Sequence, residues 1–245
     1  TTIKRSVLIK FLKDKLYTNS IIFGKKVIQV IDKNEKININ FTDGSSDVVD
    51  YLIVSDGTFS NTKSIIEKNF PEPVFSEAFA IRSQVTSKDI NEIDISNISL
   101  IMGAKAHLVL YPINKKKEIN LVCIMRHKSK DIGSLKETLE NILFKQNQNL
   151  ANLFKGNLKS WPIYTSRKTV KSVLKNVLYM GDSFYTFLPT MAQGSSQAIE
   201  SANEIFELIN NNHPDLENEY FKNRSQRSKL INKRSKFNYF AFHLG

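Results

Sequence analysis

Glycine is scarce in this chain of 245 residues, and its distribution excludes several phosphate-binding motifs. The chain has nine glycines, and no two of them are separated by a single residue. It therefore contains neither the G-x-G-x-x-G pattern of dinucleotide-binding folds nor the P-loop. The G-x-S-x-G turn that presents a nucleophilic serine is absent as well. Taken alone, these absences argue against a complete dinucleotide-binding enzyme.

Cysteine and histidine are rare too. The one cysteine, Cys123, excludes an intrachain disulfide, and its place in an apolar run predicts a buried, reduced thiol. A reduced thiol fits the cytoplasm, which is the localisation that we expect. The four histidines and this cysteine show no metal-ligand spacing, so we expect no metal site.

Long apolar runs are missing, and the excess of positive charge is dispersed. No stretch approaches the ~20 apolar residues that a transmembrane helix needs, and residues 1–20 do not resemble a signal peptide. The net charge is +11, with its densest basic stretch at residues 224–236, which contains no interleaved aromatic residue. We therefore expect solvated helix faces, with neither a membrane span nor a nucleic-acid site.

The hydrophobic periodicity of the chain predicts an α/β fold. Prolines and glycines mark boundaries near residues 71–73 and 156–162, and several strands lie between them. This pattern predicts a mixed sheet (71–160) inserted between two parts of another domain (1–70 and 161–245). We expect helices over 5–16, 132–147, 195–210 and 215–236, and strands over 21–31, 36–41, 48–54, 75–85, 98–103, 106–112, 119–126 and 173–180, with a hairpin turn at Lys115–Lys117.

The segment from Val177 to Glu200 is the most informative part of the sequence. A strand is predicted to end at Gly181-Asp182, and a loop with Pro189 leads through Gln193-Gly194 to the helix expected over 195–210. This arrangement resembles the GD motif of the flavoprotein aromatic hydroxylases, the family with the para-hydroxybenzoate hydroxylase fold. The alternative is a strand, turn and helix without a ligand.

The resemblance implies that Asp182 bonds the ribityl chain of FAD and that the helix start meets the flavin ring. A helix N-terminus offers unpaired N–H groups and a positive dipole end, so Gly194, Ser195 and Ser196 suit the negative charge of reduced flavin. The family usually continues Gly-Asp with Ala-Ala-His. This chain instead has Ser183, Phe184 and Tyr185.

Two earlier segments are similar to the same family in the same order. Arg5 and Leu8 resemble an Arg-x-x-Leu helix start whose arginine lies near FAD. Asp56-Gly57, followed by Ser60, resembles the DG motif, which serves binding of both FAD and the pyridine nucleotide, and Lys63 stands near the usual arginine. Read without the family, Asp56-Gly57 is an ordinary strand terminus.

The stretch from Met102 to Pro112 resembles the substrate strand of the salicylate hydroxylase and 3-hydroxybenzoate 6-hydroxylase branch. Its His107 and Tyr111 are four residues apart, so a strand places both on one face. In that branch the matching residues contact the substrate phenol, and a histidine could accept the phenolic proton. A structural histidine and a core tyrosine remain the alternative. The tail that ends in Phe242-His243-Leu244 resembles the closing helix of this branch.

Together these resemblances imply an FAD-dependent monooxygenase that hydroxylates a small phenolic substrate. NADH or NADPH would reduce the flavin, and O2 would form a flavin C4a-hydroperoxide that transfers its distal oxygen. The family's first ~100 residues, with the glycine-rich ADP site and the first βαβ unit, are expected to be missing here. Two alternatives stay open, namely a flavin oxidoreductase with a non-phenolic substrate and a remnant without flavin activity. The question of a homodimer is left open too.

Overall fold

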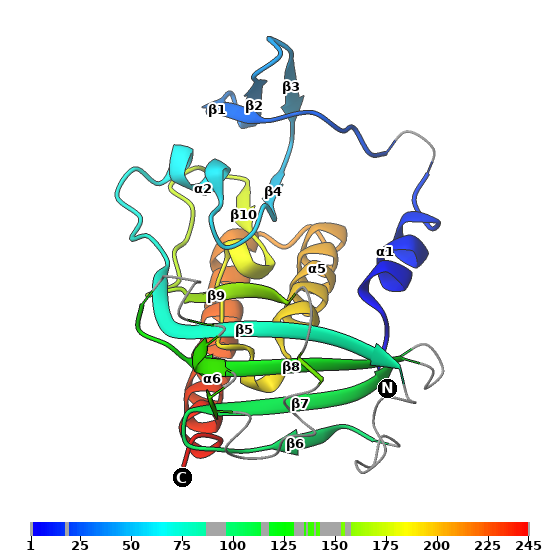
Figure 1. Ribbon diagram of the computed structural model, residues 1–245. Helices are drawn as coiled ribbons and strands as arrows, with labels where there is room; N and C mark the ends of the chain where they lie inside the picture. The colour runs from blue at the N-terminus through cyan, green and yellow to red at the C-terminus, as the bar shows by residue number, and fades with distance from the viewer. Residues whose placement is uncertain are drawn as a thin grey trace. The chain divides into compact units, whose positions relative to one another are not determined.

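The computed structural model describes residues 2–17, 20–86, 97–113, 118–129, 135, 137–139, 141–142, 153–154 and 158–244. The chain divides into two compact units (Figure 1). Unit 1 comprises Thr1–Ile21, Phe75–Ile163 and Phe240–Gly245, and unit 2 comprises Ile22–Val74 and Tyr164–Tyr239. The expected lysine turn at 115–117 lies outside the described residues, whereas residues 135, 137–139 and 141–142 are helical, as expected.

Unit 1 is built on a five-stranded sheet with the order β6-β7-β8-β5-β9. The long strand β5 (Val74–Thr86) pairs antiparallel with β8 (Glu118–Arg126), which pairs antiparallel with β7 (Ala106–Ile113). The strand β6 (Ser99–Ile101) pairs with the other edge of β7, and β9 (Lys159–Thr165) lies beside β5. The register between β7 and β8 is unbroken, so alternate residues of β7 point to opposite faces.

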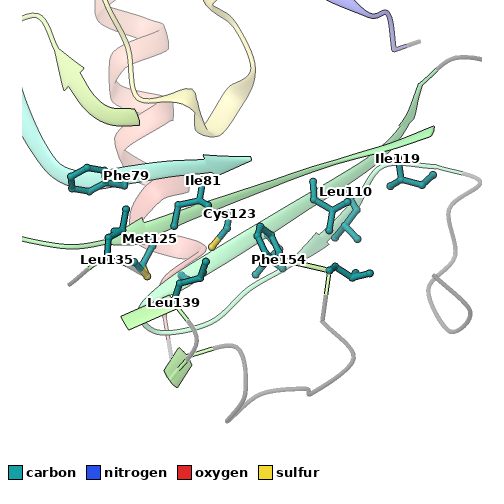
Figure 2. Packing of buried hydrophobic residues seen from close by; sticks show 13 residues of the cluster. Phe79, Ile81, Leu110, Ile119, Cys123, Met125, Leu135, Leu139 and Phe154 are labelled. Carbon is teal, nitrogen blue, oxygen red and sulfur yellow. The ribbon is translucent and has the colours of Figure 1, made fainter. Parts of the chain in front are cut away.

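One face of this sheet carries the core of unit 1. Leu108 and Leu110 of β7 lie there with Leu121 and Cys123 of β8, and all four are at most 1% exposed. Figure 2 shows this cluster, in which Phe79 and Met125 lie near Leu135 and Leu139. Burial raises the pKa of the Cys123 thiol to about 12, so the thiol is protonated and inert, as its apolar surroundings predicted.

Unit 2 contains two small sheets. An antiparallel sheet of β1 (Val27–Lys33), β2 (Lys36–Phe41) and β3 (Ser46–Val49) has the order β1-β2-β3. Its strand β2 alternates as predicted, with Ile37 and Ile39 buried. A second sheet consists of β4 (Leu52–Val54) and β10 (Val177–Tyr179), which run parallel although more than a hundred residues separate them.

The expectation of one strand over 48–54 is wrong. The chain leaves the β1-β2-β3 sheet after Val49 and enters the parallel pair at Leu52. Asp50 lies at this junction, exposed, with its carboxylate 2.8 Å from the Lys36 ammonium. Because the apolar run is nearly continuous, the sequence does not show that its two halves belong to two different sheets.

The buried faces of the helices in unit 2 carry polar side chains that a pattern of apolar residues does not mark. In α5 (Gly194–Asn210) the buried side chains are Gln197, Ser201 and Ile205, whereas Ile199 and Phe206 are exposed. Ser201 can be buried because its hydroxyl donates to the Gln197 carbonyl at 2.7 Å. This hydrogen bond within the helix offsets the free-energy cost of burying the polar hydroxyl.

The C-terminal helix α6 (Leu216–Ala241) is longer than expected and is not a fully exposed charged helix. Arg224 on its buried face reaches Glu204 of α5, with 2.5 Å between Nε and Oε2. Small serines make this face hard to recognise by hydropathy. The buried residues of α6 are Leu216, Tyr220, Arg224, Ser225, Ser228, Ile231 and Ser235.

The first helix and the ends of the chain differ from the expected domain division. The helix α1 (Arg5–Lys13) buries no residue and belongs to unit 1, although residues 1–70 were assigned to the other domain. The C-terminal residues 240–245 also group with unit 1. The inserted segment, expected over 71–160, compares with the central part of unit 1 at 75–163. None of the described helices combines the length and apolar character that a membrane span requires.

Candidate functional site

The parallel pair β4 and β10 brings the two predicted motifs of unit 2 to one edge. Val54 is in register with Tyr179, and the Met180 N–H donates to the Val54 carbonyl at 2.9 Å. Both strands then end, and the chain turns at Asp56-Gly57 on one side and at Gly181-Asp182 on the other. Carboxyl ends of parallel strands are where open α/β sheets bind their ligands.

Ser183 ties the two turns together. Its side chain is fully buried, and its Oγ lies 2.5 Å from the Val54 carbonyl oxygen and 2.7 Å from that of Met180. The usual family residue at this position, alanine, has no hydroxyl. The departure noted in the sequence therefore supplies a hydrogen bond between β4 and the turn that follows β10.

Two threonines add a second connection between the turns. The hydroxyls of Thr58 and Thr186 are 3.1 Å apart, and Thr186 also donates to the Asp182 carbonyl at 3.0 Å. The segment after Asp56-Gly57 is thereby held next to the segment after Gly181-Asp182.

Lys63 makes the third connection and is buried. Its ammonium donates to the Ser183 carbonyl at 2.6 Å and lies 3.9 Å from the centre of the Phe70 ring. Burial lowers the pKa of Lys63 to about 8, and the carboxylates of Asp56, Glu67 and Glu72 oppose this lowering. This lysine belongs to α2 (Asn61–Ile66), a helix that the periodicity did not predict.

Asp182 lies beside the start of α5. A Cβ built on Gly194 would be 3.9 Å from Oδ1 of Asp182, so the carboxylate stands next to the first residue of the helix. Asp182, Gly194, Ser195 and Ser196 are all exposed, and Gln193 forms no side-chain cap there. The arrangement combines an exposed acceptor with helix N–H donors and a backbone without a side chain. These groups fit a ligand that carries both hydroxyl groups and negative charge.

Asp56 has a structural role in addition to its predicted one. Its Oδ2 accepts from the Thr62 N–H at 3.0 Å, which satisfies a free amide of the α2 N-terminus. The following Gly57 has a φ of +92°, in the region that favours glycine. Asp56 is exposed, so its carboxylate is also accessible to a ligand.

Phe184 and Tyr185 point into the core of unit 2. Phe184 is 5% exposed, and its ring makes edge contacts with Tyr220 and Phe221 of α6 at 6.0 and 6.2 Å between centroids. Tyr185 is 7% exposed and packs on Phe187. Because both rings are buried among other aromatic side chains, they leave Asp182 exposed.

Two other predicted cofactor residues lie apart from this group. Pro189 is exposed at the start of a short 3-10 helix (Pro189–Met191) that precedes α5. Arg5 is exposed on α1 and belongs to unit 1, whereas the remaining residues belong to unit 2. Their roles toward a cofactor remain predictions.

The predicted base His107 is held by the C-terminal turn of unit 1. Its ring is 1% exposed, and its Nδ1 lies 3.2 Å from Nε2 of His243, itself 5% exposed. The ring of Phe242 adds an edge contact at 5.1 Å between centroids. Burial, and to a lesser extent His243, lower the pKa of His107 to about 4. The sequence reasoning had singled out neither Phe242 nor His243 as a contact of His107.

Tyr111 shares the sheet face of His107, opposite the core face. The regular register of β7 supports this placement, with His107 opposite Ile124 and Tyr111 opposite Asn120. Four residues of strand span about 13 Å, so the two side chains leave the same face of the sheet at this separation. Arg82 of β5 is opposite Val122 and lies 5.2 Å from the centre of the Trp161 ring.

The fold of this chain is found in known proteins. No family model matches the chain. The structure of a salicylate hydroxylase substrate complex superposes with a TM-score of 0.84 and 21% identity, covering 98% of this chain and 66% of that protein. The architecture is therefore that of the FAD-dependent hydroxylases.

Sequence relatives point to the same family. An FAD-dependent monooxygenase of Gibberella moniliformis is 23% identical over 220 residues, and a salicylate hydroxylase of Pseudomonas putida is 23% identical over 224 residues. These matches include 81% and 80% of this chain but 49% and 51% of the relatives, so the chain spans about half of their length. The resemblance to the FAD-dependent aromatic hydroxylases is thereby confirmed.

Replacing Gly181 tests how closely the turn after β10 approaches α5. Gly181 has a φ of +62°, and an added Cβ would lie 3.3 Å from the Cβ of Ala198. Gly181→Ala should lower the free energy of unfolding by the left-handed backbone cost of about 1–2 kcal/mol plus the cost of this contact. Gly44→Ala is the control, because φ is +82° there and nothing lies within 4 Å. Equal losses in urea unfolding would contradict the close approach.

Acid should destabilise the protein through His107. An unfolded histidine binds a proton below about pH 6.5, whereas folded His107 binds it only below about pH 4. Between these values the unfolded state holds more protons, so stability falls as pH decreases, by up to about 3 kcal/mol. His107→Asn should remove this part of the decline in urea unfolding, and His213→Asn should retain it. An unchanged decline in His107→Asn would rule out the titration of this ring as its cause.

Proposed function

We propose that this chain supplies the flavin-ring and substrate residues of an FAD-dependent monooxygenase that hydroxylates a phenolic ring. NADH or NADPH and O2 would be its co-substrates. The observation that carries the proposal is the exposed carboxylate of Asp182 beside the side-chain-free start of α5. Its support comes from the relatives named FAD-dependent monooxygenase and salicylate hydroxylase.

The proposed FAD contacts of unit 2 come from its two turns and from the start of α5. Asp182 would accept hydrogen bonds from ribityl hydroxyls, and the first-turn N–H groups at Gly194, Ser195 and Ser196 would favour negative charge on the ring. Gly181 and Gly57 would allow close backbone approach, and Asp56 and Pro189 would add further contacts. For Arg5, the resemblance implies a place near FAD, which stays a prediction. When bound, FAD would supply electron transfer from NAD(P)H and the chemistry of O2.

The proposed substrate contacts come from β7 in unit 1. His107 would accept the phenolic proton, which raises the electron density of the ring, and Tyr111 would contact the substrate from about 13 Å further along the strand. The low pKa keeps His107 neutral, which is the form that a base requires. It also makes the base weak, since moving a proton from a phenol of pKa about 10 to a group of pKa about 4 costs about 8 kcal/mol. A neighbouring phenolate would raise the pKa of the imidazole and offset part of this cost.

Replacing Asp182 tests the cofactor assignment. Asp182→Ala should weaken FAD binding about 10- to 100-fold, because a charge-assisted hydrogen bond contributes about 1.5–3 kcal/mol. The affinity is measured by titrating the full-length protein with FAD and following flavin fluorescence. Asp32→Ala, on the exposed face of β1, serves as the control. If the wild-type protein binds no FAD, or if both variants bind it equally, the assignment is wrong.

Replacing His107 tests the reaction. His107→Asn should lower kcat for hydroxylation of a phenol about 10²- to 10⁴-fold at pH 7, the usual contribution of a positioned base. The deficit should shrink as the pH approaches that of phenol ionisation, because the substrate then loses its proton to water. Product formation and NAD(P)H consumption are followed together, with His213→Asn as control. Unchanged phenol hydroxylation in His107→Asn would eliminate His107 as the base, and turnover of non-phenolic substrates alone would point to a different oxidoreductase.

A further inference from the structure

We infer that His243 is a positioning residue and proton acceptor for His107, so that the C-terminal turn completes the base. This inference rests on the proposed function for its reaction, but its geometry belongs to unit 1 alone. His243 would hold His107 in the form with a free electron pair on Nε2. It would then take over the proton that His107 receives from the substrate.

The contact between the two rings is specific. Nδ1 of His107 and Nε2 of His243 are 3.2 Å apart, and the ring centres are 4.8 Å apart with planes inclined by 61°. A backbone hydrogen bond from the His243 N–H to the Phe240 carbonyl, at 3.1 Å, shapes the turn that presents this ring. Both rings are almost fully buried. Leaving Nδ1 of His107 and Nε2 of His243 without a hydrogen bond would therefore cost free energy.

A hydrogen bond between two neutral imidazoles needs one donor and one acceptor. If His107 donates from Nδ1, its Nε2 carries the free electron pair and can act as a base. If His243 donates instead, Nε2 of His107 carries the proton and can only donate. A base at His107 therefore requires His243 to be the acceptor.

The proton path then balances without another reactant. The phenol O–H bond breaks, its electron pair stays on the oxygen, and the proton binds Nε2 of His107. In the same step the proton on Nδ1 of His107 moves to Nε2 of His243, so that His107 stays neutral and His243 carries the positive charge. Release of a proton from Nδ1 of His243 to water would complete the path.

Such a relay is useful because His107 holds a proton poorly. Transfer from a phenol of pKa about 10 to His107 is unfavourable by about 10⁶, given its pKa of about 4. Release of the same proton to water at pH 7 is unfavourable by only about 10³. If the Nδ1 proton leaves for His243 in the same step in which Nε2 takes up the substrate proton, the unfavourable imidazolium at His107 is not formed, and release to water sets the overall equilibrium.

Among the residues that the structure describes, the other neighbours of His107 offer no side chain that could accept its proton. Across the sheet His107 is opposite Ile124, and Phe242 covers it from the C-terminal turn, so both of these neighbours are apolar. Tyr111 on the same face is about 13 Å along the strand. Within the described part of the chain, His243 is the titratable group that contacts the His107 ring.

The tautomer of His107 is measured first, by 15N-detected NMR of the imidazole nitrogens, which needs no catalysis. In the wild-type protein the proton of neutral His107 is expected on Nδ1. His243→Phe should move it to Nε2, whereas His243→Gln should leave it on Nδ1, because the glutamine oxygen can accept the same hydrogen bond. A proton on Nε2 in the wild-type protein, or no change in His243→Phe, would overturn the inference. Circular dichroism and urea unfolding verify that each variant folds.

Turnover separates positioning from proton transfer. His243→Phe should lower kcat for the phenol about 100-fold at pH 7, within the range of a proton-transfer group, with little change in KM. His243→Gln should recover part of this loss, since it positions His107 but accepts no proton. Equal rates in the wild type and both variants would overturn the relay. A wild-type protein that shows the expected tautomer but hydroxylates no phenol would refute the proposed function and leave the positioning of His107 by His243 supported.

Discussion

Parallel pairing of β4 with β10 is the constraint on which the site around Asp56 and Asp182 depends. The pair has only three residues in each strand, and it joins segments that are far apart in the sequence. Such a short ladder is strengthened by side chains at its end, where Ser183 bonds the Val54 carbonyl and Lys63 bonds the Ser183 carbonyl. These contacts hold the turns with Asp56 and Asp182 together. Without them, two exposed carboxylates would have no defined relation to each other.

Burial of ionisable groups is used differently in the two units. In unit 2 the charge of Lys63 is kept, because a carbonyl, an aromatic ring and nearby carboxylates replace much of the water that it loses. In unit 1 the charge of His107 is suppressed, since its surroundings are an apolar ring and another histidine. The first arrangement stabilises a turn, whereas the second keeps an imidazole neutral at pH 7. The same desolvation thus has a structural consequence in one unit and a chemical one in the other.

Several differences between the expected and the observed structure have physical causes. The apolar run over 48–54 was read as one strand, because hydrophobicity does not report to which sheet a residue belongs. Phe184 departs from the small residue that is usual in the family, and its ring packs against α6. The buried face of α6 was missed because serines and an ion pair make a face that hydropathy treats as exposed. In each case the deciding partner lies on a segment remote in sequence.

The amino-acid sequence by itself determined the α/β class, the strand ends before Asp56 and Asp182, the helix that follows Gly194 and the shared face of His107 and Tyr111. These features follow from local rules, namely side-chain periodicity, the turn preferences of glycine and the residues that begin helices. Only the tertiary structure decided that Ser183 and Lys63 join the two turns and that His243 contacts His107. Those contacts join residues more than a hundred positions apart, so no local pattern encodes them, and they form only when the strands pair and the helices pack.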